Sequence, residues 1–258
     1  MLDTLFSLEG RTALITGGSR GIGEMIAEGY VKAGAKVYIS SRKAADCHET
    51  AERLSQFGTC IALPADVSGA DGAKALAAQY LEQENTLDIL VNNAGAAWGA
   101  DFEDFPESGW DKVMDLNVKS PFFLTQALFG ALKAGGSAGR PAKVINIASI
   151  DGLSVSMMQT YSYAASKSGL IHLTKRLALE LVKSNIVVSA IAPGAFASNM
   201  NKAARDHADM VSQFVPSGRI GDIEDMAGAA IFLASRAGDY VVGSTLTVDG
   251  GVAHTRAG

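Results

Sequence analysis

The sequence predicts a single α/β domain over residues 1–258, built on a seven-stranded, doubly wound parallel sheet with helices on both faces. Three observations predict this fold class. Short β-branched runs alternate with longer segments whose apolar residues recur at helical spacing. The runs are apolar on both faces, as are the strands of a parallel sheet that is covered on both sides. No Pro/Ser-rich linker and no internal repeat divides the chain. The predicted strands are residues 12–16, 36–40, 60–63, 87–92, 143–149, 186–193 and 245–250.

The composition excludes several classes of protein. A net charge of -5 with no block of lysine and arginine argues against nucleic acid as a partner. The first residues carry no basic region before a long apolar run, and no stretch nears about 18 apolar residues, so we expect neither a secretory signal nor a membrane span. Cys47 and Cys60 lack CxxC spacing and the four histidines are scattered, which indicates a reducing compartment and no metal site. We expect a cytoplasmic enzyme or binding protein.

A glycine-rich loop follows the first predicted strand and opens the first predicted helix, which ends near Gly34. The loop reads TGGSRGIG over residues 16–23. In this setting Gly17 permits a tight turn, Gly21 lets the backbone approach a pyrophosphate, and Gly23 allows close helix packing. The alternative is a turn without a ligand, but the flanking strand and helix favour a Rossmann-like dinucleotide site. The predicted cofactor contacts in this loop are Gly17, Ser19, Arg20, Gly21, Ile22 and Gly23.

The end of the second predicted strand indicates which dinucleotide binds. Folds that bind NAD usually place an acidic residue here, which accepts hydrogen bonds from the ribose hydroxyls. This chain reads SSRK over residues 40–43, with Ser41 and Arg42 in place of the acid and Arg20 within reach of the same corner. A 2′-phosphate needs donors and positive charge. The sequence therefore predicts NADP(H), although Arg42 and Lys43 could instead begin a solvated helix.

Four motifs carry a family resemblance because they occur in one order: TGGSRGIG, NNAG (92–95), Ser149 and YAASK (163–167). With them, the chain resembles the short-chain dehydrogenase/reductase family over essentially its whole length. Within the family it is most similar to bacterial NADPH-dependent 3-oxoacyl (β-ketoacyl) reductases, especially those linked to rhamnolipid synthesis. One departure is the gap of fourteen residues from Ser149 to Tyr163, one more than is common. The resemblance also includes Asp66-Val67, Asn117, Pro193-Gly194 and VDGG (248–251).

The resemblance implies further cofactor contacts after the later strands. Asp66 is expected to accept from the adenine amino group and Val67 to cover the ring, with a simple turn role for Asp66 as the alternative. The NNAG backbone would approach the ribose and adenine side, while Asn92 could instead satisfy backbone groups of the sheet. The implied contacts are Asp66, Val67, Asn93, Ala94, Gly95, Pro193, Gly194, Phe196 and Ser198.

Two tyrosines lie near Lys167, and helical geometry separates their roles. Tyr163 is four residues from Lys167, so the two side chains share one face about 6 Å apart along the axis. Tyr161 is six residues away and about 240° around the helix. Moving a phenol pKa from ~10 to ~7 requires about 4 kcal/mol, and a cation ~4 Å away supplies a comparable amount at an effective dielectric of ~20. We expect Tyr163 to donate the proton in a carbonyl reduction, and Lys167 also to hold the ribose hydroxyls.

Ser149 and Asn117 complete the predicted catalytic set. Ser149 ends the fifth strand, where ligands bind in open α/β sheets, and would hydrogen-bond the substrate oxygen. By the resemblance, Asn117 would anchor a water that connects Lys167 to solvent. Taken singly, Ser149 could be a cap and Asn117 structural. As an ordered set they predict catalysis.

Apolar residues after the strands are expected to form the substrate side. Residues 198–216 are predicted to be a lid over it, although its apolar residues could equally belong to the core. The helix expected at 111–132 is apolar on more than one face, which is compatible with the homotetramer usual in the family. Residues 135–142 are expected to form a surface loop. The predicted substrate contacts are Trp98, Ile150, Met157, Met158, Tyr161, Phe196 and Met200.

These observations predict an NADPH-dependent reductase that converts a small-molecule carbonyl, a 3-oxoacyl thioester or hydrophobic ketone, into a secondary alcohol. The alternative within the same class is an NAD(P)-dependent dehydrogenase of a sugar, polyol or steroid alcohol. A different class, a non-catalytic NADP-sensing regulator, is disfavoured by the complete set of Ser149, Tyr163 and Lys167. A Rossmann methyltransferase is disfavoured by the glycine loop and the Arg42 corner.

Overall fold

A computed structural model describes residues 2–198 and 200–255, and one parallel sheet forms its centre. The strand order is β3-β2-β1-β4-β5-β6-β7, and every neighbouring pair is parallel. In register, Ala13 of β1 lies between Val37 of β2 and Ile89 of β4. The predicted fold class is confirmed. The strands are β1 Thr12–Thr16, β2 Lys36–Ser40, β3 Cys60–Ala62, β4 Ile89–Asn92, β5 Ala142–Ile147, β6 Ile186–Pro193 and β7 Thr245–Val248.

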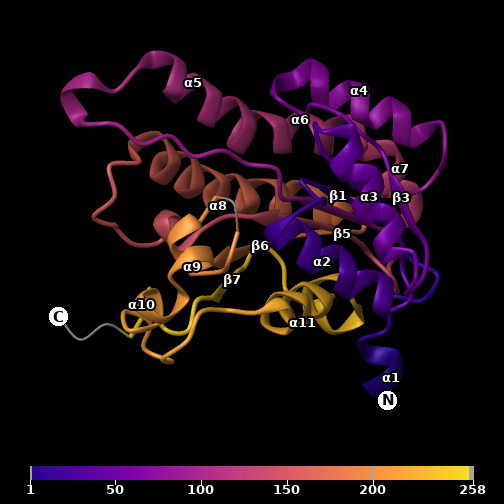
Figure 1. The fold of residues 1–258 in the computed structure, drawn as a ribbon. Coiled ribbons are helices and arrows are strands. Elements are labelled where there is room, and N and C mark those ends of the chain that lie inside the picture. The colour runs from indigo at the N-terminus through magenta and orange to yellow at the C-terminus, as the bar shows by residue number, and fades with distance from the viewer. Residues whose placement is uncertain (1, 199, 256–258) are drawn as a thin grey trace.

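Helices cover both faces because successive strand residues point to opposite sides of the sheet. Ile15 belongs to a buried core that includes residues of α2, α3 and α11, whereas its neighbour Leu14 belongs to a second core with α4, α6, α7 and α8. Figure 1 shows α4 and α6 on one side of the sheet and α11 on the other. The helices are α1 Leu2–Leu5, α2 Gly21–Lys32, α3 Ala44–Leu54, α4 Gly69–Leu81, α5 Glu107–Met114, α6 Ser120–Ala127, α7 Phe129–Gly135, α8 Tyr161–Leu181, α9 Lys202–Asp206, α10 Ala208–Ser212 and α11 Ile223–Ala234.

The prediction of one continuous helix over residues 111–132 is wrong in detail. The segment is divided into α5, a π-helical turn η2 (Asp115–Lys119), α6 and α7. Pro121 explains the irregularity, because it has no N–H to donate to the carbonyl of Asn117 four residues earlier. Several strands are also one or two residues shorter than expected, since β4 begins at Ile89 and β5 and β7 end at Ile147 and Val248. The π-helical turn thus places an irregular stretch of helix backbone at Asn117.

The carboxyl ends of the central strands form the place where a ligand is expected. The chain runs from β1 outward to β2 and β3, then crosses back to place β4 on the other side of β1. Open α/β sheets bind ligands at this reversal of strand order. The run predicted as a lid follows β6 and contains the short helices α9 and α10, with residue 199 outside the described residues. Within the described ranges, no helix is both long and apolar enough to cross a membrane.

Candidate active site

The glycine loop has the backbone that its sequence predicts. Gly17 and Gly21 have φ values of 65° and 55°, in the left-handed region that favours glycine. A Cβ on Gly23 would lie 2.2 Å from the carbonyl oxygen of Gly17, so the start of α2 packs directly on the loop. No side chain larger than hydrogen therefore fits at Gly23.

Asn93 and Thr16 fasten this loop to the end of β4. The Asn93 side chain donates to the carbonyl oxygens of Thr16 (2.9 Å) and Gly17 (3.1 Å). The hydroxyl of Thr16 accepts hydrogen bonds from the backbone N–H groups of Asn93 and Ala94, each at a distance of 3.0 Å. Asn93 was expected only as a cofactor contact, and Thr16 was not singled out. The sequence feature that could have indicated this role for Thr16 is its position at the end of the first predicted strand.

The corner at the end of β2 is rich in unused donors. Arg20 and Arg42 are exposed, and neither forms an ion pair with another described residue. Ser40 is 1% exposed, and its hydroxyl has no hydrogen-bond partner among the described residues. The Ser41 hydroxyl donates to the carbonyl of Lys43 over 3.2 Å. Two exposed guanidinium groups suit an additional phosphate at this corner.

Asp66 has the turn geometry that was the alternative to its adenine contact. Its carboxylate accepts from the backbone N–H of Ser68 (3.0 Å) and from the Ser68 hydroxyl (2.7 Å). The hydrogen bond from Ser68 and the charge of Arg42 lower the pKa of Asp66. Both contacts use the same carboxylate oxygen, so the other is available to an adenine amino group. Val67 is buried in the core on the α4 side.

Ser149, Tyr163 and Lys167 lie together where β5 ends and α8 begins. The Ser149 hydroxyl accepts from the backbone N–H of Asp151 over 3.1 Å and shares a hydrogen bond with Tyr163. The Lys167 ammonium lies 5.6 Å from the centre of the Tyr163 ring and donates to the carbonyl of Ile147 over 2.8 Å. Three polar groups from two elements thus converge on one point.

Burial shifts both titratable members of this set. It raises the pKa of the Tyr163 phenol, an effect that the hydrogen bond from Ser149 opposes. It lowers the pKa of Lys167 to about 8. The pKa of Tyr163 was expected to be lowered by the ammonium, but in this structure desolvation raises it. A phenol that keeps its proton is the form that a proton donor requires.

The polar atoms of the Asn117 side chain form hydrogen bonds with other residues of the protein. Its amide oxygen accepts from the N–H of Ala96 (2.8 Å), and its amide nitrogen donates to the carbonyl of Ala96 and to the hydroxyl of Ser166 (both 2.9 Å). The side chain thereby ties the end of β4 to α8. A water anchored by Asn117 would have to use its backbone carbonyl, which receives no helical hydrogen bond from Pro121.

The side chains expected on the substrate side differ in exposure. Met157 and Met158 are 101% and 69% exposed, and Met200 is 53% exposed. The Trp98 ring packs on Gly109, with the Lys112 ammonium 5.3 Å from the ring centre. Ile150 lies half-buried directly after Ser149. The structure therefore leaves an apolar, open rim on this side.

Tyr161 and Phe196 are placed differently from the other expected substrate contacts. Tyr161 makes edge contacts with Phe102 and Phe105, at ring-centre distances of 5.7 and 5.6 Å, away from Lys167. Phe196 is 2% exposed and belongs to the core, so its ring does not line an open substrate space. The expectation of a Phe196 side-chain contact with substrate is therefore not supported by this geometry, which leaves only its backbone for a ligand.

The turn after β6 brings its residues to the glycine loop. Pro193 ends β6, and a Cβ on Gly194 would lie 2.7 Å from the Asp249 side chain, so the turn packs on the VDGG motif. A Cβ on Gly21 would lie 3.1 Å from the Ser198 Cβ. The Ser198 hydroxyl accepts a hydrogen bond from the backbone N–H of Asn201 at a distance of 3.0 Å. The start of the predicted lid thus borders the phosphate cradle.

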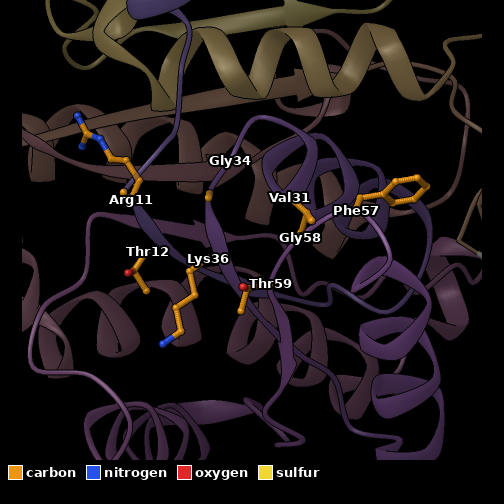
Figure 2. Close-up of a pocket in the computed structure, with 10 residues that line it drawn as sticks. Arg11, Thr12, Val31, Gly34, Lys36, Phe57, Gly58 and Thr59 are labelled. Carbon is orange, nitrogen blue, oxygen red and sulfur yellow. The ribbon is translucent and has the colours of Figure 1, made fainter.

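A separate pocket of about 410 Å³ lies at the opposite end of the sheet. It is lined by residues at the amino ends of the first three strands, among them Arg11, Lys36 and Phe57, whose side chains point in different directions in Figure 2. No group of polar atoms converges there. Nor do the described ranges contain three or more His, Cys, Asp or Glu residues grouped as a metal site would need.

Comparison with known proteins assigns a family. A family profile described as an enoyl-(acyl carrier protein) reductase matches residues 17–253. The chain is 51% identical over 251 residues to the rhamnolipids biosynthesis 3-oxoacyl-[acyl-carrier-protein] reductase of Pseudomonas aeruginosa, covering 95% of this chain and 97% of that protein. It is 40% identical over 255 residues to the 2-dehydro-3-deoxy-D-gluconate 5-dehydrogenase of Dickeya dadantii, covering 97% and 98%.

Solved structures agree with this placement. The structure described as the Pseudomonas aeruginosa RhlG/NADP active-site complex superposes with a TM-score of 0.94 at 49% identity, covering 97% of this chain and 99% of that one. A gluconate 5-dehydrogenase from Burkholderia cenocepacia in complex with NADP and tartrate gives a TM-score of 0.90 at 33% identity, covering 99% and 100%. The resemblance drawn from the sequence motifs is confirmed by these matches.

Proposed function

Because this chain belongs to the short-chain dehydrogenase/reductase family, we propose that it is an NADPH-dependent reductase of a 3-oxoacyl thioester or another hydrophobic ketone. The chain is an oxidoreductase of that family and acts on a small molecule. The observation that carries the proposal is the convergence of Ser149, Tyr163 and Lys167 next to the NNAG motif, where a Cβ on Gly95 would lie 3.7 Å from the Lys167 ammonium. The proposed product is a secondary alcohol.

The described residues fit NADP(H). The glycine cradle would take the pyrophosphate at the amino end of α2, and Arg20, Ser41 and Arg42 would take the 2′-phosphate. Lys167 has two ammonium hydrogens left for ribose hydroxyls after its bond to Ile147. Two solved relatives are described as NADP complexes, which supports the same cofactor for this chain. When bound, the reduced nicotinamide supplies the hydride.

The proposed mechanism assigns one task to each residue of the set. The Ser149 hydroxyl accepts from the Asp151 N–H, and when substrate binds its own hydrogen would turn from Tyr163 to the ketone oxygen. Tyr163 donates its proton to that oxygen as the carbon receives hydride, which yields the alcohol and leaves a phenolate. Lys167 stabilises the phenolate, and a water held at the Asn117 carbonyl would return the proton from solvent. The sum is ketone, NADPH and one proton converted to alcohol and NADP⁺.

The proposed substrate class rests on the character of the substrate side. The exposed side chains next to Ser149 are mainly apolar, and methionines accommodate flexible apolar ligands. Oxidation of a sugar alcohol is the second candidate, favoured by the 40% identity to a 2-dehydro-3-deoxy-D-gluconate 5-dehydrogenase. An acyl chain suits the exposed Met157 and Met158 better than a polyol does.

The proposal extends to assembly and location. We propose a homotetramer formed through helices that include α6 and α8, with the enzyme in the cytoplasm. The apolar side chain of Leu179 on α8 is 66% exposed in the isolated chain, which supports a contact between subunits at this helix. Residues 198–216 are proposed to act as the lid.

A spectrophotometric assay tests the proposed function. Purified enzyme is mixed with NADPH and a panel of 3-oxoacyl thioesters, simple ketones and keto-sugars, and the loss of NADPH absorbance is followed. We expect the highest kcat/KM for the 3-oxoacyl thioesters. Higher kcat/KM for keto-sugars would favour the second candidate, and binding of NADPH without turnover of any carbonyl would favour the regulator.

A further inference from the structure

Asp151 places a carboxylate beside the predicted catalytic hydroxyls, and the mechanism above does not use its side chain. Asp151 belongs to a one-turn 3₁₀ helix, η3 (Ile150–Gly152), directly after Ser149. Its carboxylate lies near Ser156, in the segment that leads to α8, and near enough to Tyr163 for its charge to act on the phenol. An acid therefore lies within the segment that forms the predicted substrate side.

The position of this acid is fixed by the packing of η3 on α8. A Cβ on Gly152 would lie 2.7 Å from the backbone of Lys167, so the two backbones are in close contact. The Ser168 hydroxyl donates to the Gly152 carbonyl over 3.1 Å, and the Ser154 hydroxyl donates to the Ile150 carbonyl over 3.3 Å. Asp151 is thus held to the same helix that carries Tyr163 and Lys167.

The surroundings of Asp151 leave its charge without a partner cation. η3 packs against α8 and β6, and β6 has no titratable residue. The titratable groups of α8 at this level are Tyr163 and Lys167, and the Lys167 ammonium is bonded to the Ile147 carbonyl. Among the described residues, no ion pair to Asp151 is formed. Partial burial strengthens the field of a charge that is not neutralised. Most of the neighbouring exposed side chains are apolar: Leu153, Val155, Met157 and Met158.

We propose that Asp151 is a specificity-determining residue whose carboxylate repels ketones carrying a negative charge near the carbonyl and admits neutral ketones and thioesters. The inference rests on the proposed function, because it requires the ketone to bind at Ser149 and Tyr163. Like-charge repulsion is an effective way to reject a wrong ligand. It would separate neutral 3-oxoacyl compounds from keto-acids, the class of compound for which some relatives are named.

A matched pair of β-ketones tests this proposal. Ethyl acetoacetate is neutral, whereas acetoacetate has the same ketone and carries a carboxylate. In Asp151→Asn, we expect the ratio of kcat/KM for the ester to kcat/KM for the anion to fall about ten-fold, with the ester itself changed less than about three-fold. The control Asp101→Asn removes an exposed acid nearby and should leave the ratio unchanged. An unchanged ratio in a folded Asp151→Asn enzyme would overturn the proposal.

Two further measurements decide the matter if the variant does not fold or the substrates do not turn over. Burial raises the pKa of Asp151, so acidification should protonate it and lower the ester-to-anion ratio in the wild-type enzyme. A ratio that stays constant as the pH is lowered to the acid limit of the folded enzyme would contradict the charge effect. Dissociation constants of both compounds on the NADP⁺ complex, measured by ligand-observed NMR, give the same ratio without catalysis. Absence of turnover would refute the proposed function, while equal dissociation constants would refute the role of Asp151.

Discussion

The charge of Lys167 should determine how readily Tyr163 gives up its proton. Its ammonium lies 5.6 Å from the centre of the phenol ring. At an effective dielectric of ~20, two unit charges at this separation interact by about 3 kcal/mol, which corresponds to a rate factor of about 100. Lys167→Met should therefore lower kcat for carbonyl reduction about 100-fold, even at saturating NADPH.

The pH dependence follows from the same group. Because burial lowers the pKa of Lys167 to about 8, the side chain is charged below that pH and neutral above it. We expect kcat in the wild-type enzyme to fall as the pH rises through about 8, and this fall to be absent in Lys167→Met. The assay is NADPH oxidation across pH 6–10, with NADPH affinity measured separately by fluorescence.

A control on the same helix separates this effect from a general loss of charge. Lys175 is exposed on α8 two turns after Lys167, and Lys175→Met should retain wild-type kcat. Lys167→Arg should recover part of the lost rate, since it restores a cation. If Lys167→Met keeps kcat within about five-fold of wild type while it binds NADPH and remains folded, the electrostatic reasoning is refuted.

Three other substitutions test the rest of the site. Tyr163→Phe should abolish carbonyl reduction and leave NADPH binding intact, because only the hydroxyl is lost; retained turnover by absorbance assay would refute its role as proton donor. Arg42→Ala should lose most of the preference for NADPH over NADH, and an unchanged ratio of the two kcat/KM values would exclude Arg42 from 2′-phosphate binding. Gly23→Ala places a methyl group 2.2 Å from the Gly17 carbonyl oxygen. It should lower the free energy of unfolding by about 1–3 kcal/mol in urea and weaken NADPH binding at least ten-fold, and wild-type values for both would show that the loop is not packed as described.

The strand segments and the covered parallel sheet could be predicted from the sequence because they depend on local pattern. Apolar runs such as residues 12–16 and 186–193 have no polar face, so only a sheet covered on both sides accommodates them. The glycine loop and the four-residue spacing of Tyr163 and Lys167 are also local features, fixed by the geometry of one turn and one helix. These features were sufficient to predict the fold class and the family.

Only the tertiary structure decided which groups are buried and what they contact across the chain. The sequence gives no sign that Asn93 holds the glycine loop through Thr16 and Gly17, since its partners lie 76 and 77 residues away. The high pKa of Tyr163 and the enclosed ring of Phe196 depend on desolvation, which is a property of the assembled fold.

Asn117 and Asp151 show the same contrast between what the sequence indicates and what the tertiary structure decides. The motif order pointed to Asn117, but its clamp on Ala96 and Ser166 became apparent only with α8 and the end of β4 in place. Asp151 was passed over because it belongs to no motif, and its importance comes from packing against α8. Spacing along the chain fixes which residues share an element, whereas electrostatics depend on distances and burial between elements that only folding creates.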